Sequence, residues 1–356
     1  MLLYQRFISA IVCLMCLGLL THCANLPSPP SSSSEESIVK LIRDGEQVEV
    51  WMNGSLFTIY QQPDEVKKPI LYPILTSKGT AITRGYPLDP KVGERADHPH
   101  HIGVWFNHGD VNDLDFWNNS TNVKPERLDH YGTIQHTAIR SVESGDEGRL
   151  HVEMEWLGPD RTVLLRESTH FRFWTGKGVR SLERHTSLTA GEDSVLFRDN
   201  KEGMFGIRLA RPLEQVNPKP TILIGEDGTP SPEKVVDTTS VNGLYRNAAG
   251  QKGDDVWGTR GSWVCIDGKI GSESISVAMF DHAENPGYPA SWHARNYGLF
   301  SVNNLGRKAY NKQEEAFHVS LAPGERLEFR HRLSVYTTDP SDEDLEKTYR
   351  QFVEKK

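Results

Sequence analysis

The sequence predicts an all-β protein, a large two-sheet β-sandwich that ends in a short C-terminal helix. Most of the chain alternates apolar and polar residues with a period of two, as half-buried strands do. Hairpin turn signals recur along it, and a helical pattern appears only in the last segment, "SDEDLEKTYRQFVEKK". Strand after strand at this length requires stacked sheets, because two sheets packed face to face bury one side of every strand.

The individual hairpins are predicted from turn residues between alternating segments. "VEVWMNGSLFTIY" turns at Asn53-Gly54, a pair that favours a tight two-residue turn. "THFRFWTGKGVRSLERHTSLTA" turns at "TGKG", and two later segments turn at "DGKIGS" and "APGE". "RLHVEMEWLG" and "YGLFSVN" supply further strands. In the last segment Ser341 is placed to cap a helix, with acidic residues filling its first turn.

Residues 1–22 predict an export signal, because a single arginine precedes an apolar run too short for a comfortable membrane span. The run ends at "LLTHC", as in a bacterial lipoprotein signal, so Cys23 is the residue expected to carry lipid. The protein would then be periplasmic or anchored to the outer membrane. Cleavage with secretion and a retained N-terminal anchor are the alternatives.

The domain organisation follows from where linker-like sequence occurs. A Pro/Ser-rich tether, predicted to be disordered, occupies residues 23–44. No such break divides residues 45–338, so we expect a single β-sandwich domain there. Residues 339–356 are expected to form the C-terminal helix.

The composition excludes several classes of protein. A formal net charge of −8 and the absence of a basic patch argue against nucleic acid as a partner. Cys265 is the sole cysteine of the expected mature chain beyond the lipidation site, which leaves no disulfide and no cysteine-based zinc site within one chain. No later run approaches transmembrane length, and no phosphate loop, Gly-x-Ser-x-Gly or HExxH motif is present.

The densest chemistry lies in "ERADHPHHIGVWFNHGDVNDLDFW", residues 94–117, which holds four of the chain's 14 histidines. If the middle of this segment is a strand, it separates into two faces. One face carries His98, His100, Ile102, Val104, Phe106, His108 and Asp110. The other carries His101, Gly103, Trp105, Asn107 and Gly109. The apolar centre of the first face is expected in the core, which leaves histidines at both ends of a core strand.

Two kinds of function would use this arrangement. His98 and His100, two residues apart on one face, could bind a divalent metal with a third ligand from elsewhere. Alternatively, the histidines exchange protons with a sugar-like substrate, with Trp105 or Trp117 as a stacking platform. Histidines that only hydrogen-bond loops and neighbouring acids are the structural alternative.

Two later segments add to this inventory. "FRDNKEGMFGIRLARP" places Lys201 and Glu202 ahead of a strand that holds Arg208. "MFDHAENPGYPASWHARNYGLF" is a loop shaped by proline and glycine around His282, Trp292, His293, Arg295 and Tyr297. Because polar groups are costly to desolvate, we expect the two histidine-rich loops to meet only at a shared functional site. There His101, His108 and Asp110 would face His293 and Arg295 across a cleft, with Glu202 on its wall.

Five segments carry a resemblance to a known family. In order they are "RGYPLDP", "GERADHPHHIGVWFNHGDVNDLDFW", "KEGMFGIRLA", "GDDVWGTRGSWV" and "FDHAENPGYPASWHARNYGLF". They resemble the bacterial family named methane oxygenase PmoA over residues 45–338. Two positions depart from it, since Ile102 stands where the family often has arginine and Asp113 where it often has glycine. A membrane methane monooxygenase subunit needs several hydrophobic spans, and this chain has none after its signal, so methane oxidation is not expected.

Strand content and size make this family similar to the galactose mutarotases, a β-supersandwich fold. That similarity implies a sugar bound in an open groove on one sheet. It also implies a histidine acid and a glutamate base that open and reclose a pyranose ring. On this chain His108 or His293 would be the acid and Glu202 the base.

Together, the residues and the resemblance predict an exported carbohydrate-active protein that binds or transforms a sugar, or an oxidised sugar, in a histidine-rich cleft. The expected catalytic residues are His108, His293 and Glu202. The expected substrate contacts are His101, Trp105, Asp110, Arg208, Trp292, Arg295 and Tyr297. No cofactor is required, although His98 and His100 could hold a divalent metal.

The expected partners are a small molecule or glycan and, through Cys23, a membrane. Two other functions stay open at this point. One is a metal-dependent enzyme, hydrolytic or oxidative, and the other is a glycan-binding lipoprotein without catalysis.

Overall fold

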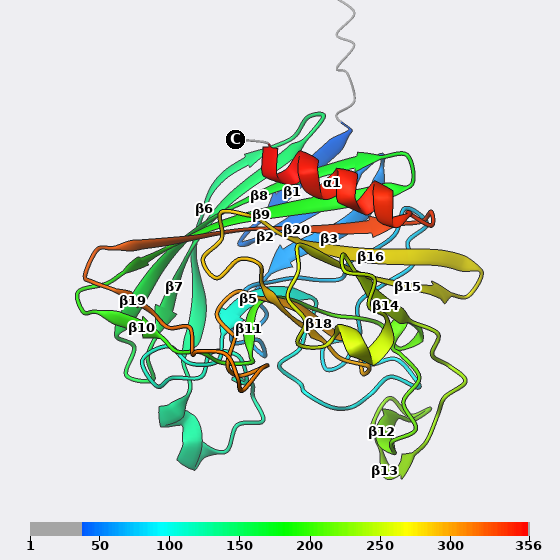
Figure 1. Cartoon of the computed structure of the whole chain (residues 1–356), viewed down its shortest axis with the longest axis horizontal. Coiled ribbons are helices and arrows are strands. Elements are labelled where there is room, and N and C mark those ends of the chain that lie inside the picture. The colour runs from blue at the N-terminus through cyan, green and yellow to red at the C-terminus, as the bar shows by residue number, and fades with distance from the viewer. Residues whose placement is uncertain (1–37, 355–356) are drawn as a thin grey trace, which may run out of the picture. The chain divides into compact units, whose positions relative to one another are not determined.

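The computed structural model describes residues 38–354, which fold into two antiparallel sheets of eight strands each, with shorter elements around them (Figure 1). In spatial order the first sheet consists of β1 (Val39–Asp44), β2 (Gln47–Met52), β3 (Ser55–Gln61), β4 (Ile70–Leu71), β5 (Val104–His108), β11 (Gly203–Arg208), β18 (Leu299–Asn303) and β17 (Ser291–Ala294). The second consists of β14 (Leu244–Asn247), β15 (Trp263–Ile270), β16 (Glu273–Asp281), β20 (Arg326–Tyr336), β9 (Val179–Ala190), β8 (Val163–Gly176), β7 (Gly148–Leu157) and β6 (Thr133–Glu143). The predicted two-sheet β-sandwich is confirmed.

Short elements accompany the sheets within residues 38–354. Two ribbons pair β10 (Val195–Phe197) with β19 (Val319–Leu321) and β12 (Thr221–Ile224) with β13 (Pro230–Val235). The 3-10 helices are η1 (Pro125–His130), η2 (Arg211–Leu213) and η3 (Gly253–Val256), and the α-helix is α1 (Asp342–Glu354). The predicted signal, with Cys23, lies outside the described residues. Among those residues, no helix is both long and apolar enough to cross a membrane.

Three of the four predicted hairpins form. β2 and β3 turn at Asn53 and Gly54, whose φ angles of 48° and 73° are the two positive values that a type I′ turn requires. β8 and β9 pair around "TGKG", and β15 and β16 pair around "DGKIGS". In these cases the turn residues and the alternation on either side agree, so the local signal suffices to give the register.

The fourth predicted hairpin, at "APGE", is wrong. β19 pairs with β10, whereas β20 pairs with β9 in the second sheet, so the strands flanking this turn have different partners. The turn itself is bound to the end of β9, because the N–H of Gly324 donates to the carbonyl of Ala190. A turn signal shows that the chain reverses there. It does not show which strands pair.

The fold also begins earlier than predicted. Residues 39–44, which the sequence assigns to a disordered tether, form β1 at the edge of the first sheet, with Val39 opposite Met52. Residues 38–354 belong to one compact unit. At the other end, Ser341 caps α1 as predicted, since its Oγ accepts from the N–H of Asp344 while the Asp344 carboxylate accepts from Ser341.

The main core lies between the two sheets. Val104 and Phe106 of β5 point into it, as do Phe300 and Val302 of β18. We call this side of the first sheet its core face. α1 lies along the outer side of the second sheet (Figure 1), where its two buried residues, Leu345 and Phe352, pack in a cluster that includes Trp263, Cys265, Ala278 and Phe280.

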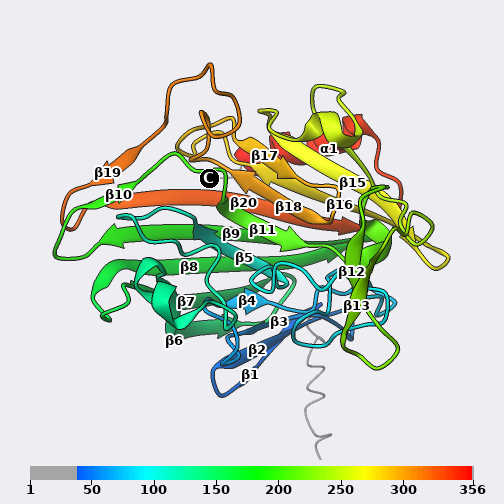
Figure 2. The same cartoon turned by 90° about the horizontal axis from the view of Figure 1, so that it is seen from below.

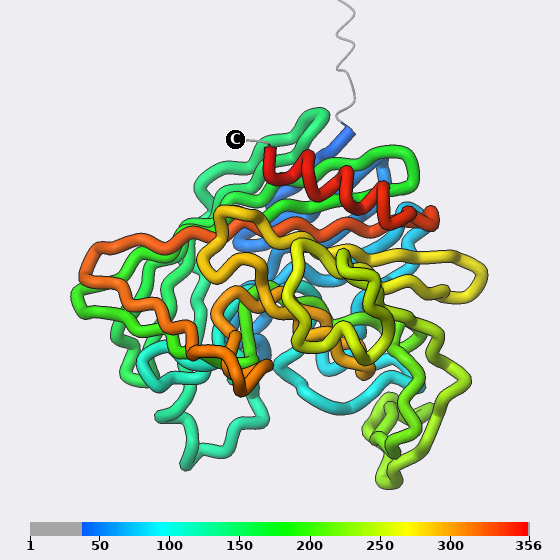
Figure 3. Tube along the Cα trace, viewed as in Figure 1, coloured from blue at the N-terminus to red at the C-terminus, as the bar shows by residue number. Residues whose placement is uncertain are grey.

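The opposite side of the first sheet, here called the site face, carries a smaller apolar cluster. Trp105 and Leu299 project from the sheet and pack with Ile102 and Trp117 from the flanking loops. Figure 2 shows β5, β11 and β18 side by side in the sheet beneath these loops. The long connection from β4 to β5, cyan in Figure 3, supplies the "DHPHH" segment.

The predicted extent of the histidine strand is too long. β5 covers only Val104–His108, and the histidines before it form a loop in which His98 has φ of 42°. Gly103 turns the chain into β5 with φ of 58°, and a Cβ there would lie 2.3 Å from the carbonyl oxygen of Leu71. The alternation therefore breaks at Gly103, and Ile102 joins the site-face cluster instead of the core between the sheets.

Candidate functional site

A row of cross-strand partners fixes which residues occupy the site face. His293 of β17 is opposite Ser301 of β18, which is opposite Gly206 of β11, which is opposite Trp105 of β5. Directly paired residues project from the same side of a sheet, so these four positions share one face. Gly206 is required there, since a Cβ on it would lie 2.9 Å from the Trp105 indole.

Four aromatic rings rise from this face in a ring stack, composed of Trp105, His101, His98 and Tyr297. Successive ring centroids are 5.3, 5.0 and 5.0 Å apart, with interplanar angles of 11°, 3° and 3°. Trp105 and His101 are buried at the base, and His101 Nε2 accepts from Trp117 Nε1 at 3.0 Å. The His98 side chain is 40% exposed, so the stack extends from buried rings at the sheet to an imidazole at the protein surface.

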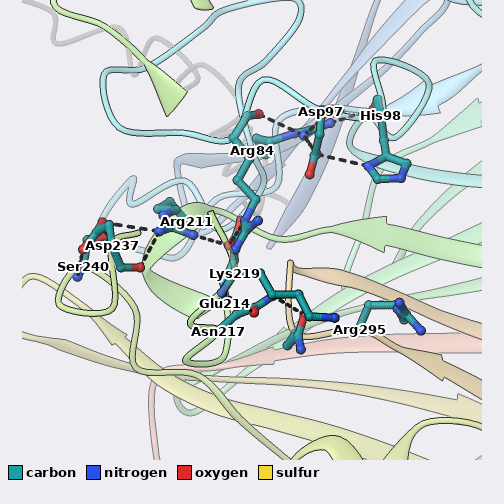
Figure 4. Close-up of polar contacts among 12 residues, drawn as sticks. Arg84, Asp97, His98, Arg211, Glu214, Asn217, Lys219, Asp237, Ser240 and Arg295 are labelled. Carbon is teal, nitrogen blue, oxygen red and sulfur yellow. Dashed lines mark hydrogen bonds and ion pairs between the residues drawn. The ribbon is translucent and has the colours of Figure 1, made fainter. Parts of the chain in front are cut away.

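A buried arginine holds the loop that supplies these histidines (Figure 4). Arg84 donates hydrogen bonds to the Asp97 carboxylate and to the backbone carbonyls of Arg95, Asp97, His98 and His101. Arg208 Nη2 binds the same Asp97 oxygen at 2.6 Å. Burial lowers the pKa of Arg84 to about 9, with the charge of Arg208 in the same direction. Two buried cations thus share one carboxylate beneath the ring stack.

Glu202 and His293 form a largely buried histidine–carboxylate pair on the site face. His293 Nδ1 lies 3.6 Å from Glu202 Oε2, while Lys201 Nζ lies 2.9 Å from Glu202 Oε1. The His293 side chain is 3% exposed and Glu202 is 15% exposed, so both are largely shielded from bulk water. Burial lowers the pKa of His293 to about 3, and the positive charges of Arg295 and Lys201 act in the same direction. The imidazole is therefore neutral at pH 7.

The two nitrogens of this imidazole have different surroundings. Nδ1 is buried and has no hydrogen-bond partner. The backbone carbonyl of Lys201 acts in the opposite direction to burial and raises the pKa of the ring. With the proton on Nε2, Nδ1 and Glu202 Oε2 are two acceptors that face each other across 3.6 Å. A hydroxyl or a protonated group placed there would satisfy both.

Aromatic rings and one cation surround the Glu202–His293 pair. The rings of Trp257 and Tyr310 lie 6.5 and 5.8 Å from the imidazole of His293. The Arg295 guanidinium lies 5.6 Å from the Trp257 ring and 5.5 Å from the Tyr297 ring. Tyr310 Oη donates to the Lys201 carbonyl at 2.6 Å, which ties the segment before β19 to the segment that carries Glu202.

The structure brings together most of the predicted contacts but separates three from the pair. His108 points to the core face, where its ring lies 5.9 Å from Phe197 and its Nε2 bonds the Arg198 carbonyl. The prediction that it faces His293 is therefore wrong. Asp110 forms an ion pair with Arg198 at 3.1 Å. Trp292 is in the main core and donates from Nε1 to the Gly261 carbonyl.

The predicted metal ligands are not arranged as a metal centre. Among residues 38–354, no group of three or more histidine, cysteine or acidic side chains is positioned to hold an ion. The His98 and His100 rings lie edge to face with centroids 5.7 Å apart. His98 instead stacks on Tyr297, and the carbonyl of His100 accepts from the buried Lys68.

Four residues that surround the site were not predicted from the sequence. Arg84 lies in a segment without a histidine, and Lys68 lies in "EVKKPI", which is indistinguishable from an exposed basic pair. Trp257 stands in "GDDVWGTRG", where a lone aromatic among glycines and acids was the available signal. Tyr310 stands in "GRKAYNKQEE", whose composition predicts only a solvated loop.

A hollow on the described surface lies away from this pair. It has a volume of about 590 Å³ and lies on the outer side of the second sheet, where His151, His170 and His185 are cross-strand partners in a row. His151 and His170 stack at 3.9 Å, and His151 Nε2 bonds Ser168 Oγ. Since these contacts engage neighbours in the same sheet, the row reads as a solvated sheet surface.

Several solved structures are distantly similar to this chain. One is an Escherichia coli K12 protein described provisionally as an aldose 1-epimerase, with a TM-score of 0.34, 12% identity, and coverage of 84% of this chain and 98% of that one. Another is a galactose mutarotase-like protein from Clostridium acetobutylicum, with a TM-score of 0.34, 10% identity, and coverage of 85% and 100%. A third is a galactose mutarotase related enzyme from Lactobacillus acidophilus, with a TM-score of 0.31, 8% identity, and coverage of 85% and 98%. At these scores the likeness carries no argument about activity.

Sequence comparison identifies the family at a coarser level than the resemblance drawn from the motifs. No curated protein matches the chain significantly. A family model described as "Family of unknown function (DUF6807)" matches residues 47–350, which include both histidine-rich segments and nearly the whole β-sandwich. The matched model carries no methane oxygenase description. The chain belongs to the DUF6807 family.

Proposed function

We propose that this protein binds a pyranose sugar, or an oxidised derivative of one, at the Glu202–His293 pair and transfers protons on it. The observation that carries the proposal is the 3.6 Å approach of His293 Nδ1 to Glu202 Oε2, with both groups lacking a donor between them. Sugars present many hydroxyl donors beside apolar C–H faces. Trp257, Tyr297 and Tyr310 offer aromatic surface next to the pair, which suits such a ligand.

The chemistry that fits best is opening and reclosure of the sugar ring. Glu202 accepts the proton of the anomeric hydroxyl. His293, neutral in the free protein, takes up a proton when the sugar binds and gives it to the ring oxygen as the C–O bond breaks. The open form rotates about the bond between the new carbonyl carbon and the next carbon. When the ring closes, the hydroxyl that was the ring oxygen returns its proton to His293, and Glu202 returns its proton to the anomeric oxygen. The two residues end as they began, and no cofactor is consumed.

The ring stack and the Asp97 network act as supports in this proposal. Arg208 and Arg84 hold Asp97, and Asp97 lies 3.3 Å from His98 Nδ1. His98 has a positive φ, a strained conformation for a residue with a side chain, and strain of this kind is often kept where a side chain contacts a ligand. We therefore include His98 as a contact to the sugar hydroxyls.

Export and membrane attachment belong to the same proposal. A lipid at Cys23 would hold the β-sandwich at a membrane surface where glycans are encountered. Replacing this cysteine, Cys23→Ser, is expected to move the protein from the membrane fraction to the soluble fraction. An unchanged membrane fraction would rule out the lipid anchor without affecting the proposed chemistry.

Turnover of a panel of reducing sugars and sugar acids by the purified protein, followed by NMR, tests the function. Interconversion of anomers that survives treatment with a metal chelator supports acid–base chemistry by the protein's own residues. Interconversion lost with the chelator and restored by a divalent metal favours a metal-dependent enzyme. Binding without any turnover favours a glycan-binding protein.

A further inference from the structure

Arg295 is an arginine without an anionic partner beside the Glu202–His293 pair. Among residues 38–354, its guanidinium makes no ion pair and no hydrogen bond, and no dashed line reaches it in Figure 4. It lies between the rings of Trp257 and Tyr297, at 5.6 and 5.5 Å. Arg84 and Arg208 nearby both form ion pairs with Asp97, so Arg295 differs from the other arginines at this site in having no carboxylate partner.

The surrounding charges leave an excess of positive charge. The cations that gather here are Arg84, Arg208, Lys201 and Arg295, and the carboxylates paired with them are Asp97 and Glu202. Three of the four cations already bind these carboxylates. Arg295 alone of the four has no carboxylate partner among the described residues, and its N–H groups form the planar fork that suits one carboxylate.

The position of Arg295 relates to that of the proposed catalytic pair. His293 and Arg295 are two residues apart, at the end of β17, which corresponds to roughly 7 Å along an extended chain. The ring of Tyr297 contacts the Arg295 guanidinium and so lies in the same region. A ligand group bound by Arg295 would therefore place the rest of a single sugar ring between the aromatic rings and the Glu202–His293 pair.

We propose that the sugar bound at this site is a sugar acid, whose carboxylate forms a two-point contact with the Arg295 guanidinium between Trp257 and Tyr297. The inference rests on the proposed function and names the substrate class for it. A carboxylate fits better than a phosphate, because one free guanidinium offers a single planar fork and Lys201 is already paired with Glu202.

The electrostatics of His293 agree with this substrate class. Arg295 is the largest charged contributor that lowers the pKa of His293, after burial itself. A carboxylate on Arg295 offsets that charge and moves the pKa of His293 back toward its ordinary value. Burial still lowers the pKa, so the effect of the carboxylate is that an acidic sugar makes protonation of the imidazole easier than a neutral sugar does. A neutral sugar provides no such effect.

Calorimetric titration of the purified protein at low salt tests the inference with two matched pairs, galacturonate with galactose and glucuronate with glucose. We expect the acid of at least one pair to bind roughly 10- to 100-fold more tightly than its neutral partner, as charged hydrogen bonds imply. Arg295→Gln is expected to abolish this preference, because it weakens binding of the acid much more than binding of the neutral sugar. Arg295→Lys, which keeps the charge without the fork, should retain part of it. Arg326→Gln is the control, since Arg326 is 65% exposed on the second sheet.

The outcomes separate the two proposals. If the neutral sugars bind as tightly as their acids, or if Arg295→Gln weakens both alike, the sugar-acid inference is wrong and the sugar site stands. If glucose 6-phosphate binds more tightly than glucuronate in an Arg295-dependent way, the carboxylate is the wrong anion. If neither neutral nor acidic sugars bind, the proposed function fails together with the inference.

Discussion

Nδ1 of His293 lies 3.6 Å from Oε2 of Glu202, and no hydrogen-bond donor satisfies Nδ1. Two acceptors that approach each other inside a protein are unfavourable unless a proton or a ligand donor joins them. Lys201 occupies the other carboxylate oxygen, so the unsatisfied side of Glu202 is the side that faces His293. His185 Nε2 makes a similar unsatisfied approach to Glu328 at 3.5 Å, but those side chains are 40% and 46% exposed. Burial therefore sets the Glu202–His293 pair apart, with side chains that are 15% and 3% exposed.

The first prediction concerns His108, which the sequence proposed as a catalytic acid. Its ring is fully buried on the core face, so His108→Ala leaves a cavity and an unpaired Arg198 carbonyl. We expect a loss of about 2–5 kcal/mol in the free energy of unfolding by urea. Activity per folded molecule should persist. His130→Ala is the control, because that side chain is 64% exposed. A stable but inactive His108→Ala protein would return His108 to the site.

His108 also gives a signed dependence on pH. Burial lowers its pKa to about 4 in the folded protein, below the ordinary value of about 6.5. The unfolded chain therefore binds this proton first, and the histidine's share of stability is lost as the pH falls from about 6.5 toward 4. His108→Phe should flatten this part of the stability profile, by up to about 1.4 kcal/mol per pH unit.

The second prediction concerns Arg84, the buried organiser of the histidine loop. Removing its guanidinium leaves four backbone carbonyls and one side of Asp97 without a donor. We expect Arg84→Gln to lower the free energy of unfolding by about 3–5 kcal/mol, as loss of one partner of a buried pair does. Arg326→Gln, at an exposed position, should change it by less than about 0.5 kcal/mol. Equal effects of the two substitutions would show that the network is not structural.

The third prediction concerns Lys68, whose ammonium group is buried near Trp105 and donates to the His100 carbonyl at 2.7 Å. Burial lowers its pKa to about 7, against an opposing effect of Asp115. Between pH 7 and 10 the unfolded chain holds this proton and the folded protein does not, so stability rises with pH.

Lys68→Met should remove this rise, which amounts to up to about 1.4 kcal/mol per pH unit. Urea unfolding at pH 7, 8 and 9 measures it, with Lys78→Met, at an exposed position, as the control. A slope that Lys68→Met leaves intact would mean that the lysine keeps its ordinary pKa in the fold.

The fourth prediction concerns Tyr310 as a positioning residue. Its hydroxyl donates to the Lys201 carbonyl and accepts from Asn303 Nδ2 at 3.3 Å. Tyr310→Phe keeps the ring and releases the segment that carries Glu202, so kcat should fall roughly tenfold while KM changes little. Stability should fall by about 1 kcal/mol. Tyr349→Phe, on α1, loses a hydroxyl contact with Tyr288 and is the matched control. A KM effect alone would assign Tyr310 to substrate binding.

Much of the fold could be predicted because its signals are local. Alternation and turn residues are enough for the hairpin at Asn53-Gly54, and a capping residue is enough for the start of α1. The errors arise where tertiary contacts decide which strands pair. β1 lacks a strong signal of its own and is held by its pairing with β2, and the strands around "APGE" pair elsewhere.

Several residues of the site could be predicted from the sequence, but the positions of their side chains relative to one another could not. Clustered histidines, Glu202 and Arg295 stood out because such residue types are unusual on shaped loops. The break at Gly103 could not be read from the pattern, because an alternating reading continues through it. That break lets His98 stack on Tyr297 above the site face. His108, by contrast, follows the alternation of Val104 and Phe106 onto the core face.

If Glu202 and His293 exchange protons with a bound sugar, the rate of anomer interconversion depends on both side chains. NMR exchange measurements on a sugar that the protein turns over should show at least a 100-fold loss in Glu202→Gln and in His293→Gln, as removal of an acid–base group implies. Both variants should bind the sugar and unfold within a few degrees of the unsubstituted protein. Interconversion that persists within threefold in both folded variants would contradict the account.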